Sequence, residues 1–296
     1  MEEASKLPTP MTLRAFAYDI KLAHTVFALP FVLATLVFVN FNWHLGTIFW
    51  ILLCMISARS FAMGMNRYLD RKLDALNPRT QKRLIPDGKL SPQAGLRWSL
   101  RFGVLFIFSA FQLNLTAAYL SPLVLVILGA YPFMKHLSWL THWYLGACLG
   151  LSPLATSLAL TGALSREVCL LGLAVMMWTA GFDILYALQD WEFDRKHALK
   201  SVPTRFGIKN SLRMSRLCFL AMVMILAVIG RLRGSGSMYF LGIFTIAGIL
   251  IWEQWVVRSS NERAISSKIN LAFFNANACV SIVYFLFTQL DAVILR

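Results

Sequence analysis

Runs of about 20 apolar residues, separated by short charged segments, are the feature that most constrains how this chain can fold. A helix needs roughly 20 mostly apolar residues to cross the hydrocarbon core of a bilayer. Nine segments meet this requirement, namely 22–42, 45–66, 99–118, 120–137, 142–162, 167–189, 211–231, 237–257 and 269–290. The sequence therefore predicts an all-α integral membrane protein, a bundle of about nine transmembrane helices that forms a single domain over residues 1–296.

The composition supports a membrane protein and argues against a nucleic-acid partner. Apolar residues make up 58% of the chain and charged residues only 14%, with a mean hydropathy of +0.63. Soluble domains have about 45–50% apolar and about 25% charged residues. The net charge of +14 could suit nucleic acid, but Lys and Arg cluster between the apolar runs. We therefore expect the lipid bilayer, and no nucleic acid, as the partner of this charge.

The distribution of Lys and Arg predicts the orientation in the membrane. With the N-terminus in the cytoplasm, the cytoplasmic segments hold 23 Lys and Arg, the opposite side holds 4, and Arg59 lies within a helix. The positive-inside rule selects this topology, which suits a bacterial inner membrane. Two long connections, about 67–98 and 190–210, are then cytoplasmic, and we expect them to cap an active site there.

The first of these connections begins with polar residues at a spacing of four. Asn66, Asp70 and Asp74 are placed at i, i+4 and i+8, so a helix would bring them onto one face. We call these three residues the first stripe. The sequence predicts that they lie at the cytoplasmic end of the second span.

The second connection begins in the same way. Tyr186, Asp190 and Asp194 form a second stripe with the same spacing, and Asp183 lies about one turn deeper in the helix. The two stripes thus occupy equivalent places at the ends of two even-numbered spans. This shared arrangement predicts a shared role.

A divalent cation would explain why carboxylates gather at a membrane surface. Like charges at i and i+4 repel each other, and charge close to hydrocarbon is costly. Mg²⁺ prefers hard oxygen ligands and commonly uses one or two carboxylates together with substrate phosphate oxygens. We therefore expect the four aspartates of the stripes to bind Mg²⁺, which would in turn hold a diphosphate.

Basic residues follow both stripes and could bind the same diphosphate. The candidates for this contact are Arg79, Arg83, Lys135, Lys200 and Arg205. Two alternatives stay open: the acids and bases could pair with each other at the membrane surface, and Lys135 could extend toward the lipid headgroups.

With these residues in view, the chain resembles the UbiA family of membrane prenyltransferases. The family pattern is close to N-D-x-x-D-x-x-x-D in one loop and Y-x-x-x-D-x-x-x-D in the other, and the two stripes match it in all but one position. The strings at 77–80, 131–135 and 200–207 also look like the family. The resemblance implies a nine-helix UbiA-like fold, Mg²⁺ as cofactor, and catalytic roles for the aspartates and Asn66.

One position departs from the family pattern. Arg67 stands where the family has its first aspartate, so the first stripe has two carboxylates and not three. The number of metal ions is therefore left open, and Arg67 becomes a candidate for direct contact with the diphosphate.

The strings at 58–67 and 183–190 are closest to the 4-hydroxybenzoate polyprenyltransferase-like branch. The resemblance therefore implies transfer of a polyprenyl group from a polyprenyl diphosphate to an aromatic acid in ubiquinone biosynthesis. An alternative is prenylation of a dihydroxynaphthoate, as in menaquinone enzymes of the futalosine route. An allylic cation would form as the diphosphate leaves, and an electron-rich ring carbon would attack it.

Arg59 lies seven residues before Asn66, hence on the same helical face about two turns deeper. An Arg at that depth needs a partner, either the carboxylate of the aromatic acid or Asp183. We expect the aromatic acid to lie near Arg59, Asp183, Tyr186 and Tyr131, and Asp183 is also a candidate base for the final proton.

Two rival functions are less well supported by the sequence. Transporters tend to bind their substrates near the bilayer midplane, whereas these acids cluster at one face. The sequence pattern of phospholipid-forming phosphotransferases is close to D-G-x-x-A-R. In this chain Asp87-Gly88 is followed by Lys-Leu-Ser-Pro, which does not match that pattern.

Overall fold

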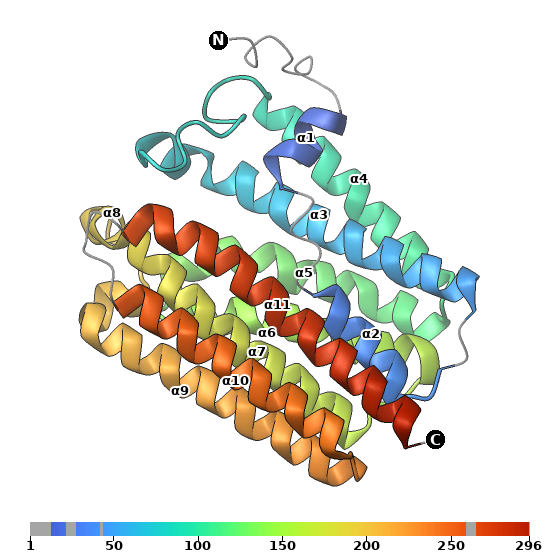
Figure 1. The fold of residues 1–296 in the computed structure, drawn as a ribbon. Helices are drawn as coiled ribbons and strands as arrows, with labels where there is room; N and C mark the ends of the chain where they lie inside the picture. Colours follow the sequence, from blue (N-terminus) through green and yellow to red (C-terminus); the bar gives the residue numbers. More distant parts are fainter. Residues whose placement is uncertain (1–12, 22–27, 42–43, 259–264, 296) are drawn as a thin grey trace, which may run out of the picture. The chain divides into compact units, whose positions relative to one another are not determined.

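The computed structural model describes residues 13–21, 28–41, 44–258 and 265–295, and in these ranges the chain forms helices and turns (Figure 1). Eight helical segments in the described ranges are long and apolar enough to cross a membrane. The helices are α1 (Leu13–Asp19), α2 (Leu29–Phe38), α3 (Leu45–Leu76), α4 (Pro92–Phe111), α5 (Leu115–Leu137), α6 (Thr141–Thr161), α7 (Arg166–Ala187), the 3₁₀ turn η3 (Leu188–Asp190), α8 (Trp191–Lys196), α9 (Val202–Arg233), α10 (Ser237–Arg258) and α11 (Ile265–Ile294).

The prediction of about nine membrane helices is close to what is observed. The first predicted span, 22–42, contains α2, which is shorter than the eight, while residues 22–27 and 42 lie outside the described ranges. Pro30 lies in the first turn of α2, where a missing N–H is tolerated.

The boundary predicted between the third and fourth spans was misplaced. α4 ends at Phe111 and α5 begins at Leu115, so the connection lies at residues 112–114 and not at 119. Asn114 explains the earlier start, because its side-chain oxygen accepts a hydrogen bond from the Ala117 amide at 2.7 Å. This N-cap stabilises the start of α5 at Leu115.

The two long connections also contain more helix than predicted. α3 continues to Leu76 and α4 begins at Pro92, so only residues 77–91 of the predicted 67–98 connect them. Ser201 accepts a hydrogen bond from the Thr204 amide in a capping box that starts α9. Gly207 then interrupts the helix with φ 75°, a conformation that favours glycine.

The chain divides into two compact units. The first unit comprises Met1–Thr25 and Trp43–Pro132. Within it α3 and α4 pack side by side along their lengths (Figure 1). Gly64 makes this packing possible, because a Cβ there would lie 2.8 Å from both the Phe16 ring and Ser99. The Ser99 hydroxyl donates to the Phe61 carbonyl at 2.8 Å, which fixes the two helices against each other.

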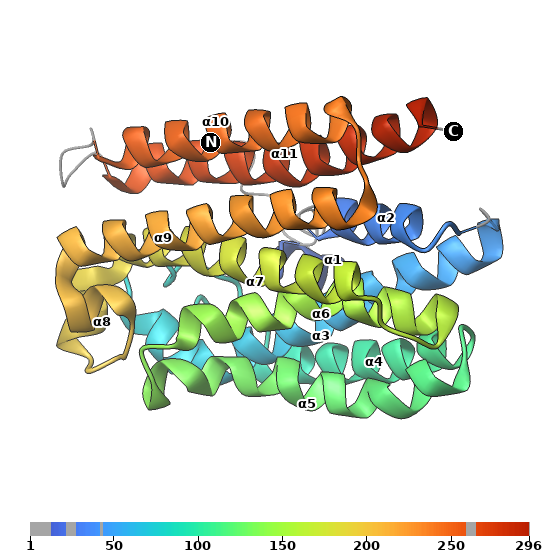
Figure 2. The same ribbon diagram turned by 90° about the horizontal axis from the view of Figure 1, so that it is seen from below.

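The second unit comprises Val26–Asn42 and Phe133–Arg296. α7 packs against both α6 and α9, and α10 lies along α11 (Figure 2). Gly150 lets the backbones of α6 and α7 approach closely, because an added Cβ would lie 2.5 Å from the Gly172 carbonyl oxygen. Small residues of this kind commonly form helix–helix contacts in membranes.

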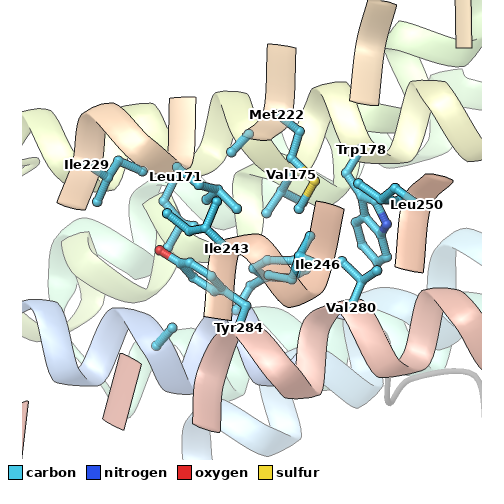
Figure 3. Packing of buried hydrophobic residues seen from close by; sticks show 14 of the residues in the cluster. Leu171, Val175, Trp178, Met222, Ile229, Ile243, Ile246, Leu250, Val280 and Tyr284 are labelled. Atoms are coloured by element: carbon cyan, nitrogen blue, oxygen red, sulfur yellow. The ribbon is translucent and has the colours of Figure 1, made fainter. Parts of the chain in front are cut away.

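A large apolar core holds the second unit together. Figure 3 shows Trp178 of α7, Met222 of α9, Ile246 of α10 and Tyr284 of α11 meeting in this core. Phe31 of α2 packs against Trp178 and Tyr284, with ring centroids 5.2 Å and 5.6 Å away. The core therefore anchors α7, the helix that leads into the second stripe.

Candidate active site

The first stripe lies near the C-terminal end of α3. Asp70 and Asp74 are each 7% exposed, and Asn66 is half-buried. α3 is continuous through these positions, so the predicted one-face arrangement holds. Buried carboxylates are costly unless they bind a cation or accept hydrogen bonds.

Arg83 supplies a cation to this stripe. Its Nη1 lies 2.7 Å from both carboxylate oxygens of Asp74. The Thr80 hydroxyl donates to the Asp74 carbonyl at 3.0 Å, and the Arg79 amide donates to the Asn77 side chain at 2.9 Å. The segment after α3 is thus folded back onto the helix end. Arg83 and Asp74 therefore form one of the acid–base pairs that the sequence left open as an alternative.

Arg67 makes a contact that the sequence did not predict. It is 5% exposed, and its Nε donates to the Asp19 carbonyl at 3.3 Å and lies 3.9 Å from the Asp19 carboxylate. The Leu84 amide donates to the same carboxylate at 2.9 Å. Burial raises the pKa of Asp19, while the Leu84 hydrogen bond and the Arg67 charge oppose this rise. Asp19 therefore joins α1, α3 and the segment after α3.

The second stripe spans a change of helix type. α7 ends at Ala187, Asp190 closes the 3₁₀ turn η3, and Asp194 lies in α8. The prediction of an uninterrupted α-helical face is therefore wrong at 188–190. Tyr186, Asp190 and Asp194 are all half-buried. The Trp191 indole N–H donates to the Pro203 carbonyl at 3.1 Å, which joins α8 to the start of α9.

Asp183 is held by a histidine that the sequence reasoning missed. The His142 Nδ1 lies 2.7 Å from the Asp183 carboxylate, and the Val202 amide donates to His142 Nε2 at 3.2 Å. Because Nε2 accepts this hydrogen bond, the proton of the neutral ring is on Nδ1 and is donated to Asp183. His142 thus connects α6, α7 and the start of α9.

The basic segment before α9 is attached to the end of α5. The Lys200 amide donates to the Lys135 carbonyl at 2.6 Å, and Lys200 Nζ donates to the Leu137 carbonyl at 3.1 Å. The Arg205 guanidinium lies over the Trp139 ring, 5.4 Å from its centroid. The structure therefore brings three of the predicted diphosphate contacts, Lys135, Lys200 and Arg205, to one end of the second unit.

Arg59 has a polar atom available for a ligand. It is half-buried in α3, and its Nε atom is buried with no hydrogen-bond partner among the described residues. The alternative partner, Asp183, instead binds His142. Tyr131 and Tyr186, the other predicted acceptor contacts, are half-buried in their respective units.

Sequence signals for the two missed residues were weak but real. Asp19 is an acid just before the first apolar run, and His142 opens another such run. Ionisable residues at these places are candidates for function or for a specific partner. Neither residue belongs to a repeated four-residue spacing, so the pattern that indicated the two stripes does not indicate Asp19 or His142.

The donor atoms suit a hard divalent cation. Asp70, Asp74, Asp190 and Asp194 offer carboxylate oxygens, the ligands that Mg²⁺ prefers. Within the described residues, neither unit gathers three or more His, Cys, Asp or Glu in one metal-binding group. Mg²⁺ commonly binds with few carboxylates and completes its shell with phosphate oxygens and water, so the carboxylate pair of each stripe, taken by itself, suits a metal–diphosphate ligand.

Comparison with known proteins relates this geometry to a family. Residues 25–277 match the UbiA prenyltransferase family. The chain is 33% identical over 220 residues to the 4-hydroxybenzoate octaprenyltransferase of Tolumonas auensis, covering 74% of this chain and 75% of that protein. It is 31% identical to the enzyme of the same name from Sodalis glossinidius, covering 81% of each.

Solved structures agree with this assignment. The apo structure of a UbiA homologue from Aeropyrum pernix K1 has a TM-score of 0.81 and 30% identity, covering 91% of this chain and 98% of that one. A UbiA homologue from Archaeoglobus fulgidus, bound to DMAPP and Mg²⁺, has a TM-score of 0.69 over 94% of this chain and 99% of its own; at 17% identity this likeness concerns the fold alone. This chain, an integral membrane protein, belongs to the UbiA prenyltransferase family.

Proposed function

We propose that this protein transfers a polyprenyl group from a polyprenyl diphosphate to 4-hydroxybenzoate, or a closely similar aromatic acid, in ubiquinone biosynthesis. Its family and the names of its relatives support this reaction. The observation that carries the proposal is the buried pair Asp70 and Asp74 on one face of α3, with the Arg83 cation already bound to Asp74. This arrangement supplies both metal ligands and a phosphate-binding cation.

Both stripes would contribute ligands for the metal and the diphosphate. Asp70, Asp74, Asp190 and Asp194 are the proposed ligands of Mg²⁺, which would stabilise the negative charge of the leaving diphosphate. The half-buried amide of Asn66 would orient the oxygens at the first stripe. Cations at both stripes would neutralise the remaining charge, and these are Arg79, Arg83, Lys135, Lys200 and Arg205.

Arg83 and Arg67 differ in what they can offer. Arg83 is 24% exposed in its side chain and can exchange one Asp74 oxygen for a phosphate oxygen. Arg67 is 6% exposed in its side chain and lies against Asp19, so contact with the diphosphate would require it to leave that position. We therefore assign Arg83 the direct contact and assign Arg67 the positioning of α1 against α3.

The acceptor would bind deeper, below the diphosphate. The unpartnered Nε of Arg59 would donate to the carboxylate of the aromatic acid, with Tyr131 and Tyr186 beside the ring. Asp183, oriented by the Nδ1 proton of His142, would accept the proton that the ring loses when the new carbon–carbon bond has formed. Positioning of the ring carbon at C1 of the prenyl group supplies much of the catalysis.

The surplus of Lys and Arg predicts that both stripes face the cytoplasm of a bacterial cell, with the N-terminus on the same side. Both substrates would then reach the site from that side, while the prenyl tail remains in lipid. The domain prediction, a single membrane domain over 1–296 with cytoplasmic connections over the site, forms part of this proposal.

An assay with purified protein in lipid vesicles tests the reaction. A radiolabelled polyprenyl diphosphate is supplied with 4-hydroxybenzoate or with a dihydroxynaphthoate, in Mg²⁺ or in EDTA. We expect labelled prenyl-4-hydroxybenzoate in Mg²⁺, no product in EDTA, and recovery when Mg²⁺ is returned. Product from the dihydroxynaphthoate alone would replace the acceptor by that of the menaquinone route. No product with either acceptor would refute the proposal.

A further inference from the structure

An apolar groove lies between α9 and α10 in the second unit. It has a volume of about 390 Å³, and its walls include Leu220, Val223, Ala247, Ile251 and Trp255. Three of these are strongly exposed, Leu220 at 55%, Ile251 at 70% and Trp255 at 65%. Both walls belong to membrane-length helices of an integral membrane protein, so the exposed apolar side chains of this groove suit contact with lipid hydrocarbon.

A cation closes one end of the groove. Arg216 precedes the other wall residues of α9, and Gln254 lies near the end of the wall formed by α10. The Arg216 Nε donates to the Gln254 side-chain oxygen at 3.2 Å. This hydrogen bond spans from one helix to the other, so the guanidinium lies across the end of the groove.

Hydrogen bonds behind Gln254 hold the partner of Arg216 in place. Gln254 is 8% exposed and donates from Nε2 to the Ser215 hydroxyl at 2.7 Å. The Ser215 hydroxyl in turn donates to the Gly181 carbonyl of α7 at 2.8 Å. With its nitrogen bound to Ser215, Gln254 presents its oxygen to Arg216. Guanidinium has five N–H groups, so those on the Nη atoms remain for a ligand.

Two further cations extend this charge along α9. Lys209, Arg213 and Arg216 are spaced at i, i+4 and i+7, hence on one face, and all three are exposed. Among the described residues, no carboxylate forms an ion pair with Arg216. A row of three cations on α9 therefore ends at the apolar groove.

We propose that this groove binds an anionic phospholipid, with the phosphate at Arg216 and one acyl chain along the groove. The three cations match the negative headgroup and would repel the ammonium group of a zwitterionic lipid. No acid among the described residues is in place to bind that ammonium group. The acyl chain would cover the exposed walls, where its burial adds favourable contacts. This site is independent of the proposed reaction, since none of its residues belongs to the stripes.

Native mass spectrometry of the purified, delipidated protein tests the proposal. Phosphatidylglycerol and phosphatidylcholine are titrated separately, and the lipid-bound fraction is measured. We expect phosphatidylglycerol to bind more tightly. Arg216→Gln should weaken its binding about fivefold, the effect typical of one Lys or Arg at an anionic membrane surface. The matched control is Arg97→Gln, which removes an exposed Arg from the first unit.

A second variant tests the groove without changing charge. Ala247→Phe fills the groove and should also lower phosphatidylglycerol binding, whereas Val228→Phe, at an exposed position of α9 away from the groove, should not. Unchanged thermal unfolding of each variant shows that it has folded. Equal binding of the two lipids, equal effects of Arg216→Gln and Arg97→Gln, or displacement of phosphatidylglycerol by polyprenyl diphosphate would overturn the proposal.

Discussion

Replacing His142 by alanine removes a side chain that joins Asp183 to the start of α9. In the described structure the ring donates from Nδ1 to Asp183 and accepts at Nε2 from the Val202 amide. A hydrogen bond to a charged group contributes about 1.5–3 kcal/mol, and a buried amide left without its acceptor costs about 1–3 kcal/mol. The Asp183 side chain is 18% exposed, so water can replace part of its lost bond. We expect a net loss of about 3 kcal/mol in the free energy of unfolding.

Two other replacements at the same position separate the two bonds. His142→Asn keeps a donor near the place of Nδ1 and should restore the bond to Asp183, whereas His142→Gln keeps an acceptor near the place of Nε2 and should restore the bond to Val202. Each should therefore be more stable than His142→Ala and less stable than wild type. His136→Ala, at an exposed position of α5, is the control.

Unfolding in detergent, followed by the loss of helical circular dichroism as SDS is added, measures these differences. Steady-state kinetics add a second readout, because displacement of Asp183 should raise the KM for the aromatic acceptor more than that for the prenyl diphosphate. If His142→Ala unfolds at the same SDS fraction as His136→Ala, the assigned hydrogen bonds do not stabilise the protein and the reasoning fails.

Three further predictions concern packing, the acceptor and pH. Gly146→Ala would drive a methyl group into a backbone carbonyl of α7 and should cost about 1–3 kcal/mol of stability, while Gly248→Ala, in open space, should cost none; SDS unfolding compares them. Arg59→Ala should raise the KM for 4-hydroxybenzoate with little change in the KM for the prenyl diphosphate. Arg97→Ala is the control and should leave the acceptor KM unchanged. An unchanged acceptor KM in Arg59→Ala would reject the role of Arg59 in binding the acceptor. Burial raises the pKa of Asp19 above its usual 3.8, so the folded protein holds this proton more tightly than the unfolded chain does. The contribution of Asp19 to stability therefore falls as the pH rises from 3.8 through the pKa of the folded state. Asp19→Asn should flatten the profile of stability against pH in this acid range, and an unaltered profile would contradict this.

Helix type and membrane location were predictable because they depend on local composition. A run of apolar residues specifies a membrane helix wherever it occurs, so eight of the nine predicted spans correspond to long described helices. The four-residue spacing of the first stripe likewise needed only that α3 continue to Leu76, as it does. These features follow from neighbours in the sequence.

What escaped prediction depends on contacts between distant residues. Nothing in the sequence near Arg67 indicates that its partner is Asp19, 48 residues earlier, or that Asp183 binds His142, 41 residues earlier. The 3₁₀ turn at Leu188–Asp190 was missed because no glycine or proline marks it. The boundary at Asn114 was missed because it depends on the hydrogen bond that the Asn114 side chain accepts from the Ala117 amide, which the apolar pattern does not report.

We propose that both stripes bind one metal–diphosphate group. A double-mutant cycle tests it directly, by titrating an unreactive thiolo-diphosphate analogue of the prenyl substrate in Mg²⁺ against wild type, Asp70→Asn, Asp190→Asn and the double variant in a calorimeter. Residues that share a ligand are coupled by about 0.5–3 kcal/mol, so the two losses in affinity should not add. Losses that add within about 0.5 kcal/mol would mean that the stripes bind independently, and the account would be contradicted.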